Sequence, residues 1–159
     1  MPRALRWLAA AAAAAIAVIV LGLVAARCHD GPLGPFTGGT FRSGIESPPP
    51  SDWSFAAARY SFELELPPAE GRSVTTGFMV VDGRLYVPSV LAEHKRWPAE
   101  VVADGRVRVR LDGRIYAFQA TRVLDPPTLA RVAPVFHDKY GTPAEGVGTR
   151  DWIFALVPR

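Results

Sequence analysis

Residues 106–118 read RVRVRLDGRIYAF and contain the clearest structural signal in the chain. Hydrophobic side chains alternate with arginines over residues 106–111, which is the period-two pattern of a strand with one buried face. A second apolar run extends over residues 114–121, and only Asp112-Gly113 separates the two. Because Asp-Gly between two such runs favours a tight type I′ turn, the stretch predicts an antiparallel β-hairpin.

The same signals recur in the flanking sequence. Residues 73–81 and 84–88 flank Asp82-Gly83, which predicts a second hairpin of the same kind. Residues 59–66 also alternate, and the apolar face consists of Tyr60, Phe62, Leu64 and Leu66. The run from Trp152 to Val157 is apolar on both faces, as in a strand that is covered on both sides.

Two helical segments are predicted between the strands. The first begins near Pro98, a residue favoured in the first helical turn, and ends at Asp104-Gly105. The second begins at Asp125-Pro126-Pro127, bends or breaks at Pro134 and ends at Tyr140-Gly141. Six or so strands with two short helices predict a mainly β (α+β) protein, a small β-barrel with helical crossovers.

An uncharged segment of 20 residues, Trp7 to Ala26, precedes the barrel. As a helix rising about 1.5 Å per residue, it spans roughly 30 Å, the thickness of the hydrocarbon core of a bilayer. We expect a retained transmembrane anchor, because the apolar region of a signal peptide usually has only about 7–15 residues. A cleaved signal segment is the alternative, since the run ends in small residues.

The charge is concentrated beside this segment. The net charge is +3, and Arg3, Arg6 and Arg27 account for all of it. A neutral body does not attract a polyanion, so no nucleic-acid partner is expected. Basic residues before the segment favour a cytoplasmic N-terminus, which predicts a single-pass protein of the cytoplasmic (inner) membrane with its body on the outer, periplasmic side.

Most sequence motifs of catalysis are missing from the chain. The only cysteine, Cys28, excludes a disulfide scaffold and directly follows the apolar segment. The three histidines are far apart and lack other metal ligands at a suitable spacing. There is no nucleophile elbow, no phosphate-binding P-loop and no dinucleotide fingerprint.

One loop has the composition of an anion site. Ser89 follows a predicted strand, and Lys95 and Arg96 lie just before Trp97 and Pro98, where a helix is expected to begin. Two cations beside free helical N–H groups favour a bound phosphate or carboxylate. Alternatively, both cations are solvated and pair with Glu93 or Glu100. The arginines at positions 106, 108 and 110 share one face of a predicted strand. This face is either exposed to solvent or lines a groove that binds an anionic ligand.

The order of these elements resembles the flavin-binding split β-barrel superfamily, which includes the pyridoxamine 5'-phosphate oxidases and the deazaflavin-dependent nitroreductases. The resemblance covers roughly residues 59–123 and includes both hairpins, the loop at residues 95–97, the short helix and the run ADGRVRV at residues 103–109. It implies a split β-barrel with two short helical segments, and the transmembrane helix predicted from the apolar run precedes this barrel.

The resemblance also implies a cofactor site. Arg72, Val74 and Thr75 match the strand that contacts the flavin ring in the oxidase branch. Ser89, Lys95 and Arg96 match the loop that takes the phosphate, and Trp97 matches a Trp of the deazaflavin branch. That branch continues with an Asn-Leu pair, where this chain has Glu100 and Val101. We therefore expect FMN, with a deazaflavin as the alternative.

These observations predict four regions: a basic flank (1–6), the anchor (7–26), a Gly/Pro-rich linker or wrap (27–58) and the split-barrel domain (59–159). The expected function is binding of a flavin-type cofactor at the membrane, with flavin-dependent oxidoreductase activity as its enzymatic form. The alternative is a non-catalytic module that binds a small anion or a protein. The resemblance further implies a homodimer, because split barrels of this kind commonly build the cofactor site between two subunits.

Overall fold

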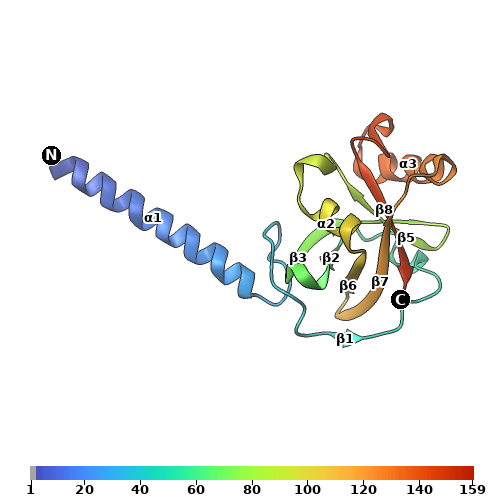
Figure 1. Ribbon diagram of the computed structural model, residues 1–159, viewed down its shortest axis with the longest axis horizontal. Helices are drawn as coiled ribbons and strands as arrows, with labels where there is room; N and C mark the ends of the chain where they lie inside the picture. The colour runs from blue at the N-terminus through green and yellow to red at the C-terminus, as the bar shows by residue number, and fades with distance from the viewer. Residues whose placement is uncertain (1–2) are drawn as a thin grey trace.

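The computed structural model describes residues 3–159 and shows a long N-terminal helix that projects from a β-barrel (Figure 1). The three α-helices are α1 (Arg3–Cys28), α2 (Trp97–Ala103) and α3 (Pro126–Tyr140). The strands are β1 (Ile45–Glu46), β2 (Ser61–Glu65), β3 (Ser73–Gly77), β4 (Met79–Val81), β5 (Arg84–Ser89), β6 (Arg106–Leu111), β7 (Arg114–Arg122) and β8 (Trp152–Pro158). The fold is mainly β, as predicted.

Both predicted hairpins are present. Strands β4 and β5 pair antiparallel around Asp82-Gly83, and β6 and β7 do so around Asp112-Gly113. Both aspartates and both glycines have positive φ, with values of 51° and 71° in the first turn and 49° and 75° in the second. Positive φ at both central residues defines the type I′ turn, so the turn type is confirmed.

The sheet is almost closed into a barrel. Its strand order is β3-β2-β6-β7-β8-β5-β4, and β1 adds a short parallel pairing to β7. The two ends of this order, β3 and β4, are consecutive in the chain and are separated only by Phe78. The prediction of one strand over residues 73–81 was therefore wrong, because the chain changes partner at Phe78, from β2 to β5.

Tyr140 at the end of α3 supports this change of partner. Its hydroxyl accepts a hydrogen bond from the backbone N–H of Phe78 (2.9 Å) and lies within donating distance of the carbonyls of Phe78 (2.8 Å) and Tyr60 (2.7 Å). A side chain at Gly77 would meet this hydroxyl at 2.7 Å, so glycine allows the close approach. Burial raises the pKa of Tyr140.

The barrel strands carry two apolar clusters. The first fills the interior and includes Phe62, Leu64 and Leu66 of the predicted apolar face. Tyr60 of the same face is 67% exposed, because it lies before the first residue of β2. Its ring meets Tyr140 edge-on. The second cluster lies between the outer face of the barrel and α3 and contains Met79, Tyr86, Val123, Val132, Phe136 and Ile153.

Strand β8 contributes to both clusters, with Phe154 in the interior and Ile153 against α3. The prediction that this strand is covered on both sides is confirmed. Helix α3 continues through Pro134 as one helix of 15 residues, and the side chain of Asp125 caps its first turn by accepting from the N–H of Thr128 (3.0 Å).

The Gly/Pro-rich segment lies against the barrel as a wrap, which we define as residues 29–58. Trp53 is buried in the barrel interior and meets Tyr116 edge-on, with ring centroids 4.9 Å apart. Phe55 stacks on Trp53 from outside. Earlier in the wrap, Gly38 exchanges two backbone hydrogen bonds of 3.0 Å with Ser73. The wrap therefore adds to the barrel core and covers one end of strand β3.

Helix α1 contains a span of 23 residues, Arg6–Cys28, that is long and apolar enough to cross a membrane. Its side chains between residues 6 and 25 are exposed, while Ala26 is buried where the helix meets the barrel. Length and composition therefore allow this helix to span a bilayer.

Candidate functional site

A cleft of about 300 Å³ lies between the open edge of β3, the end of β5 and the C-terminal half of α3. It brings together Thr75 and Lys95, which come from the two halves of the predicted cofactor site. The remaining lining residues are Thr76, Gly77, Pro88, Val90, Phe136, Tyr140 and Thr142. Apolar walls with a few polar groups are typical of small-molecule sites.

The edge of β3 offers backbone hydrogen-bonding groups to this cleft. Ser73 directs its N–H and C=O away from β2, because both bond to Gly38 of the wrap. Since backbone groups alternate in direction along an antiparallel strand, Thr75 also directs its N–H and C=O to the outer edge. The wrap covers this edge at Ser73, and the edge lies open to the cleft at Thr75.

Two polar side chains of the cleft have unused hydrogen-bonding capacity. Thr142 has a buried hydroxyl oxygen with no partner among the described residues. Lys95 has an exposed side chain, and no carboxylate in residues 3–159 lies within ion-pair distance of its ammonium group. The cleft thus combines a cation, a hydroxyl and a strand edge, which are groups that bind phosphate and the polar edge of a planar ring.

The two other predicted cations lie outside this cleft. Arg72 pairs with Glu100 of α2, and its side chain is only 11% exposed. Arg96 is 87% exposed and lies 3.7 Å from the other carboxylate oxygen of Glu100, the pairing that we considered as the alternative to anion binding. Arg72 therefore connects the segment before β3 to α2, whereas Arg96 pairs within the first turns of α2 itself.

The three remaining predicted residues belong to the barrel interior or its boundary. Trp97 is buried and packs against Phe154, with ring centroids 5.6 Å apart. Val74 is half-buried and packs against the interior cluster. Ser89 is fully buried, and its hydroxyl has no partner in the described part of the chain. The assignment of all seven residues to a cofactor stays a prediction.

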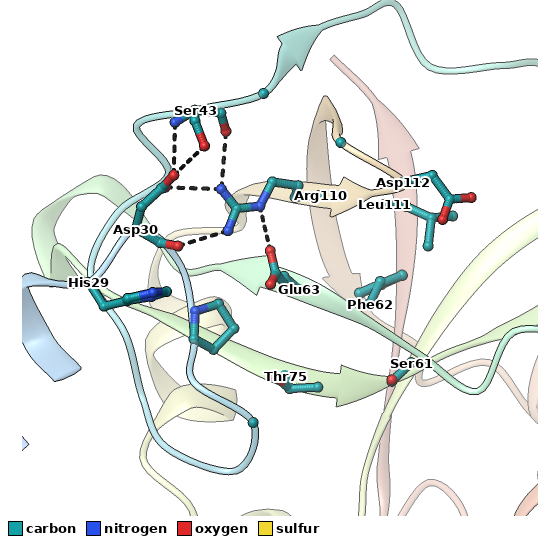
Figure 2. A pocket seen from close by; sticks show the side chains of 14 residues that line it. His29, Asp30, Ser43, Ser61, Phe62, Glu63, Thr75, Arg110, Leu111 and Asp112 are labelled. Atoms are coloured by element: carbon teal, nitrogen blue, oxygen red, sulfur yellow. Dashed lines mark hydrogen bonds and ion pairs between the residues drawn. The ribbon is translucent and has the colours of Figure 1, made fainter.

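A larger hollow of about 810 Å³ lies between the wrap and strands β2, β3 and β6, but its central cation is already paired. Figure 2 shows Asp30 and Glu63 directed at the guanidinium group of Arg110. Arg110 also donates to the backbone oxygens of Ser43 (3.0 Å) and Asp30 (2.9 Å). Since each nitrogen of its guanidinium group already donates to an oxygen, Arg110 is not free to bind a phosphate in this hollow.

Asp30 holds the wrap at this point. Its carboxylate accepts hydrogen bonds from the side chain and N–H of Ser43, from the N–H of Arg42 (2.7 Å) and from Arg110 (3.0 Å). These bonds hold the pKa of Asp30 well below its usual range. Arg106 and Arg108 of the same strand face also pair with carboxylates. Arg108 and Arg110 therefore attach the wrap to β6, whereas Arg106 pairs with Asp104 just before the strand.

Sequence reasoning did not identify the α3 side of the cleft. Phe136, Tyr140 and Thr142 reach it only because α3 packs beside β4. Their sequence signal is limited to the end of a helix at Tyr140-Gly141. In the described part of the chain, no group of three or more His, Cys, Asp or Glu side chains is placed to hold a metal ion.

No protein-family model and no curated protein sequence matches the chain. Solved structures do resemble its fold. A conserved hypothetical protein from Mycobacterium tuberculosis superposes with a TM-score of 0.51 at 18% identity, over 66% of this chain and 76% of the other. HutZ, the heme storage protein from Vibrio cholerae, also gives 0.51, at 15% identity over 66% and 85% of the two chains.

A FAD-binding protein from Mesorhizobium loti gives a lower TM-score of 0.43 at 18% identity, over 65% of this chain and 83% of the other. At these identities, the two structures with scores of 0.51 are similar in fold alone. Together with the nearly closed antiparallel barrel described above, they show that the chain has the split β-barrel fold that its resemblance to flavin-binding proteins implied.

Proposed function

We propose that this chain is a membrane-anchored split-barrel protein that binds a phosphorylated flavin, FMN in the first instance, in the cleft between β3, β5 and α3. The observation that carries the proposal is the meeting of Thr75 and Lys95 in one cleft. The two residues are 20 positions apart in sequence, and the family resemblance assigns Thr75 to the flavin ring and Lys95 to the phosphate.

Each group of the cleft has a role in this proposal. Lys95 pairs with the phosphate, because its ammonium group has no carboxylate partner among residues 3–159. The outward N–H and C=O of Thr75 bond the polar edge of the flavin ring. Thr142 supplies its free hydroxyl, and the apolar wall formed by Pro88, Val90 and Phe136 excludes water.

When bound, a flavin would supply hydride-transfer chemistry, which makes flavin-dependent oxidoreductase activity the enzymatic form of the proposal. The chain would contribute binding, orientation and a dry surface, and no nucleophilic side chain is required. A deazaflavin is the alternative cofactor. A cleft of about 300 Å³ is at the lower end for a ligand of this size, so we propose that a second copy of the chain covers the remainder in a homodimer.

Helix α1 places the barrel at the membrane in this proposal. We assign it as a single-pass anchor in the cytoplasmic membrane, with the barrel on the periplasmic side. The length and apolar character of residues 6–28 support the span. The arginines that precede it support the orientation.

The flavin proposal is tested by titrating the purified full-length protein with FMN and with riboflavin, which lacks the phosphate. Lys95→Ala removes one charge-assisted contact worth about 1.5–3 kcal/mol, so FMN affinity is expected to fall roughly 10- to 100-fold. Riboflavin affinity is expected to change much less.

Arg96→Ala is the matched control, because Arg96 is the adjacent cation but does not line the cleft. It should leave FMN affinity within a factor of about three, which corresponds to less than 1 kcal/mol. Equal losses in the two variants would contradict the role of Lys95. If the wild-type protein binds neither flavin, the cofactor proposal is wrong and the non-catalytic binding module takes its place.

A further inference from the structure

A short loop with exposed apolar side chains follows α1 directly. Residues 31–36 read GPLGPF and contain no charge. Leu33 is 43% exposed and Phe36 is 57% exposed. Exposed apolar side chains that lie together are typical of surfaces that contact a protein or a membrane.

The backbone of this loop is suited to a medium that contains little water. Leu33 and Phe36 exchange two backbone hydrogen bonds, of 3.1 and 3.0 Å, which close the loop upon itself. Pro32 and Pro35 have no N–H group to satisfy. Unpaired backbone groups are costly in lipid, and the two hydrogen bonds between Leu33 and Phe36 satisfy the backbone of the two residues with the exposed apolar side chains.

The loop has a defined position relative to α1, because the end of the helix is attached to the barrel. The N–H of His29 bonds to the carbonyl of Ala26 (3.1 Å), and the carbonyl of His29 accepts from Gly39 (3.0 Å). A side chain at Gly39 would lie 2.6 Å from the carbonyl of Arg27, so the wrap passes directly against the last turn of the helix. Figure 1 shows the loop after α1 on the side of the barrel that the helix approaches.

The charges near the loop are compatible with a lipid surface. Asp30 is the acidic residue next to the loop, and it shares the guanidinium group of Arg110 with Glu63, so one negative charge of this cluster is left for another cation to balance. Arg27 is exposed at the end of α1, where a cation can meet anionic headgroups.

We propose that residues 31–36 form a second membrane contact, in which Leu33 and Phe36 enter the interface of the bilayer that α1 spans. The inference rests on the proposed anchoring by α1. Its consequence is a fixed orientation of the barrel on the membrane, since a spanning helix alone permits rotation and tilt whereas two contacts do not.

The experiment uses the full-length protein in vesicles of phosphatidylcholine and phosphatidylglycerol. In a Cys28→Ser background, single cysteines replace Phe36 or Phe55 and are labelled with an environment-sensitive fluorophore. Phe55 is the matched control, because it is an exposed phenylalanine of the same wrap (63% exposed) that lies close to the barrel core at Trp53. Brominated lipids should quench the label at position 36 and leave the label at position 55 unchanged.

Leu33→Cys, labelled in the same way, provides a second position and should also be quenched. Vesicle flotation separates the two proposals. Protein that floats with the vesicles while all three labels resist quenching would overturn the second contact and leave the anchor intact. Protein that does not float with the vesicles would overturn both the anchor and the contact.

Discussion

Replacing Tyr140 with phenylalanine tests the corner at which the sheet closes. The change removes one hydroxyl and keeps the ring, which packs against Phe136 and Tyr60. The N–H of Phe78, a fully buried residue, loses its acceptor at 2.9 Å. An unsatisfied buried donor costs about 1–3 kcal/mol, so we expect the free energy of unfolding to fall by about that amount. For a chain of this size, Tm should fall by about 2–12 °C.

The measurement is urea unfolding of the full-length protein in a mild detergent, followed by tryptophan fluorescence. Tyr60→Phe is the control, because Tyr60 is exposed and its ring meets Tyr140 without a hydrogen bond from its hydroxyl. This control should change the free energy of unfolding by no more than about 0.5 kcal/mol. If the two variants lose equal stability, the Tyr140 hydroxyl does not stabilise the corner.

The same hydroxyl predicts a dependence on pH. Burial raises the pKa of Tyr140 above the ordinary value of 10.0, so the folded state favours the neutral phenol. Its contribution to stability is complete below that ordinary value and declines as pH rises through the folded-state pKa. Wild-type protein should therefore lose stability at alkaline pH more steeply than Tyr140→Phe.

Three further predictions concern the turns, the wrap and the topology. Gly113→Val should lower the free energy of unfolding by about 1 kcal/mol or more in urea unfolding, because φ is +75° there. Open space surrounds Gly113, so backbone strain is the only cause of the loss. Gly83→Val should cost at least as much, since the new valine side chain would also meet Asp52. Asp30→Asn should speed proteolysis of the wrap. Because the folded state lowers the pKa of Asp30, its carboxylate stabilises the wrap fully above about pH 3.8, and the wild-type wrap should become more sensitive to protease as the pH falls below that value. Protease added to spheroplasts should degrade residues 28–159, and survival of this body would contradict the periplasmic orientation.

Local sequence was sufficient for several elements of this fold. The hairpins at Asp82-Gly83 and Asp112-Gly113 follow from the turn preference of two residues and the alternation around them. The start of α3 follows from Asp125, a helix-capping residue placed before two prolines. In these cases the interactions that select the structure join residues close in sequence, so a short window contains the necessary information.

Local sequence reasoning predicted only some of the residues that line the candidate cofactor cleft. Lys95 and Arg96 are adjacent cations with the same local signal, yet only Lys95 lines the cleft, and Arg96 pairs with Glu100. Trp97 matched a family motif, but the structure buries it against Phe154. The direction of each side chain depends on how α2 packs onto the barrel, and a sequence window does not contain that packing.

By itself, the sequence determined the β character of the body, its two type I′ hairpins, the helix that follows Asp125 and the apolar span before residue 28. Only the tertiary structure decided that the chain changes partner at Phe78, that Tyr140 seals this corner and that the wrap covers the arginine face through Asp30. The hydrogen bond between Tyr140 and Phe78 joins groups 62 residues apart, and the ion pair between Asp30 and Arg110 joins groups 80 residues apart. No local pattern encodes which distant partner a buried N–H or a guanidinium group will meet, because that choice is made by the packing of the whole barrel.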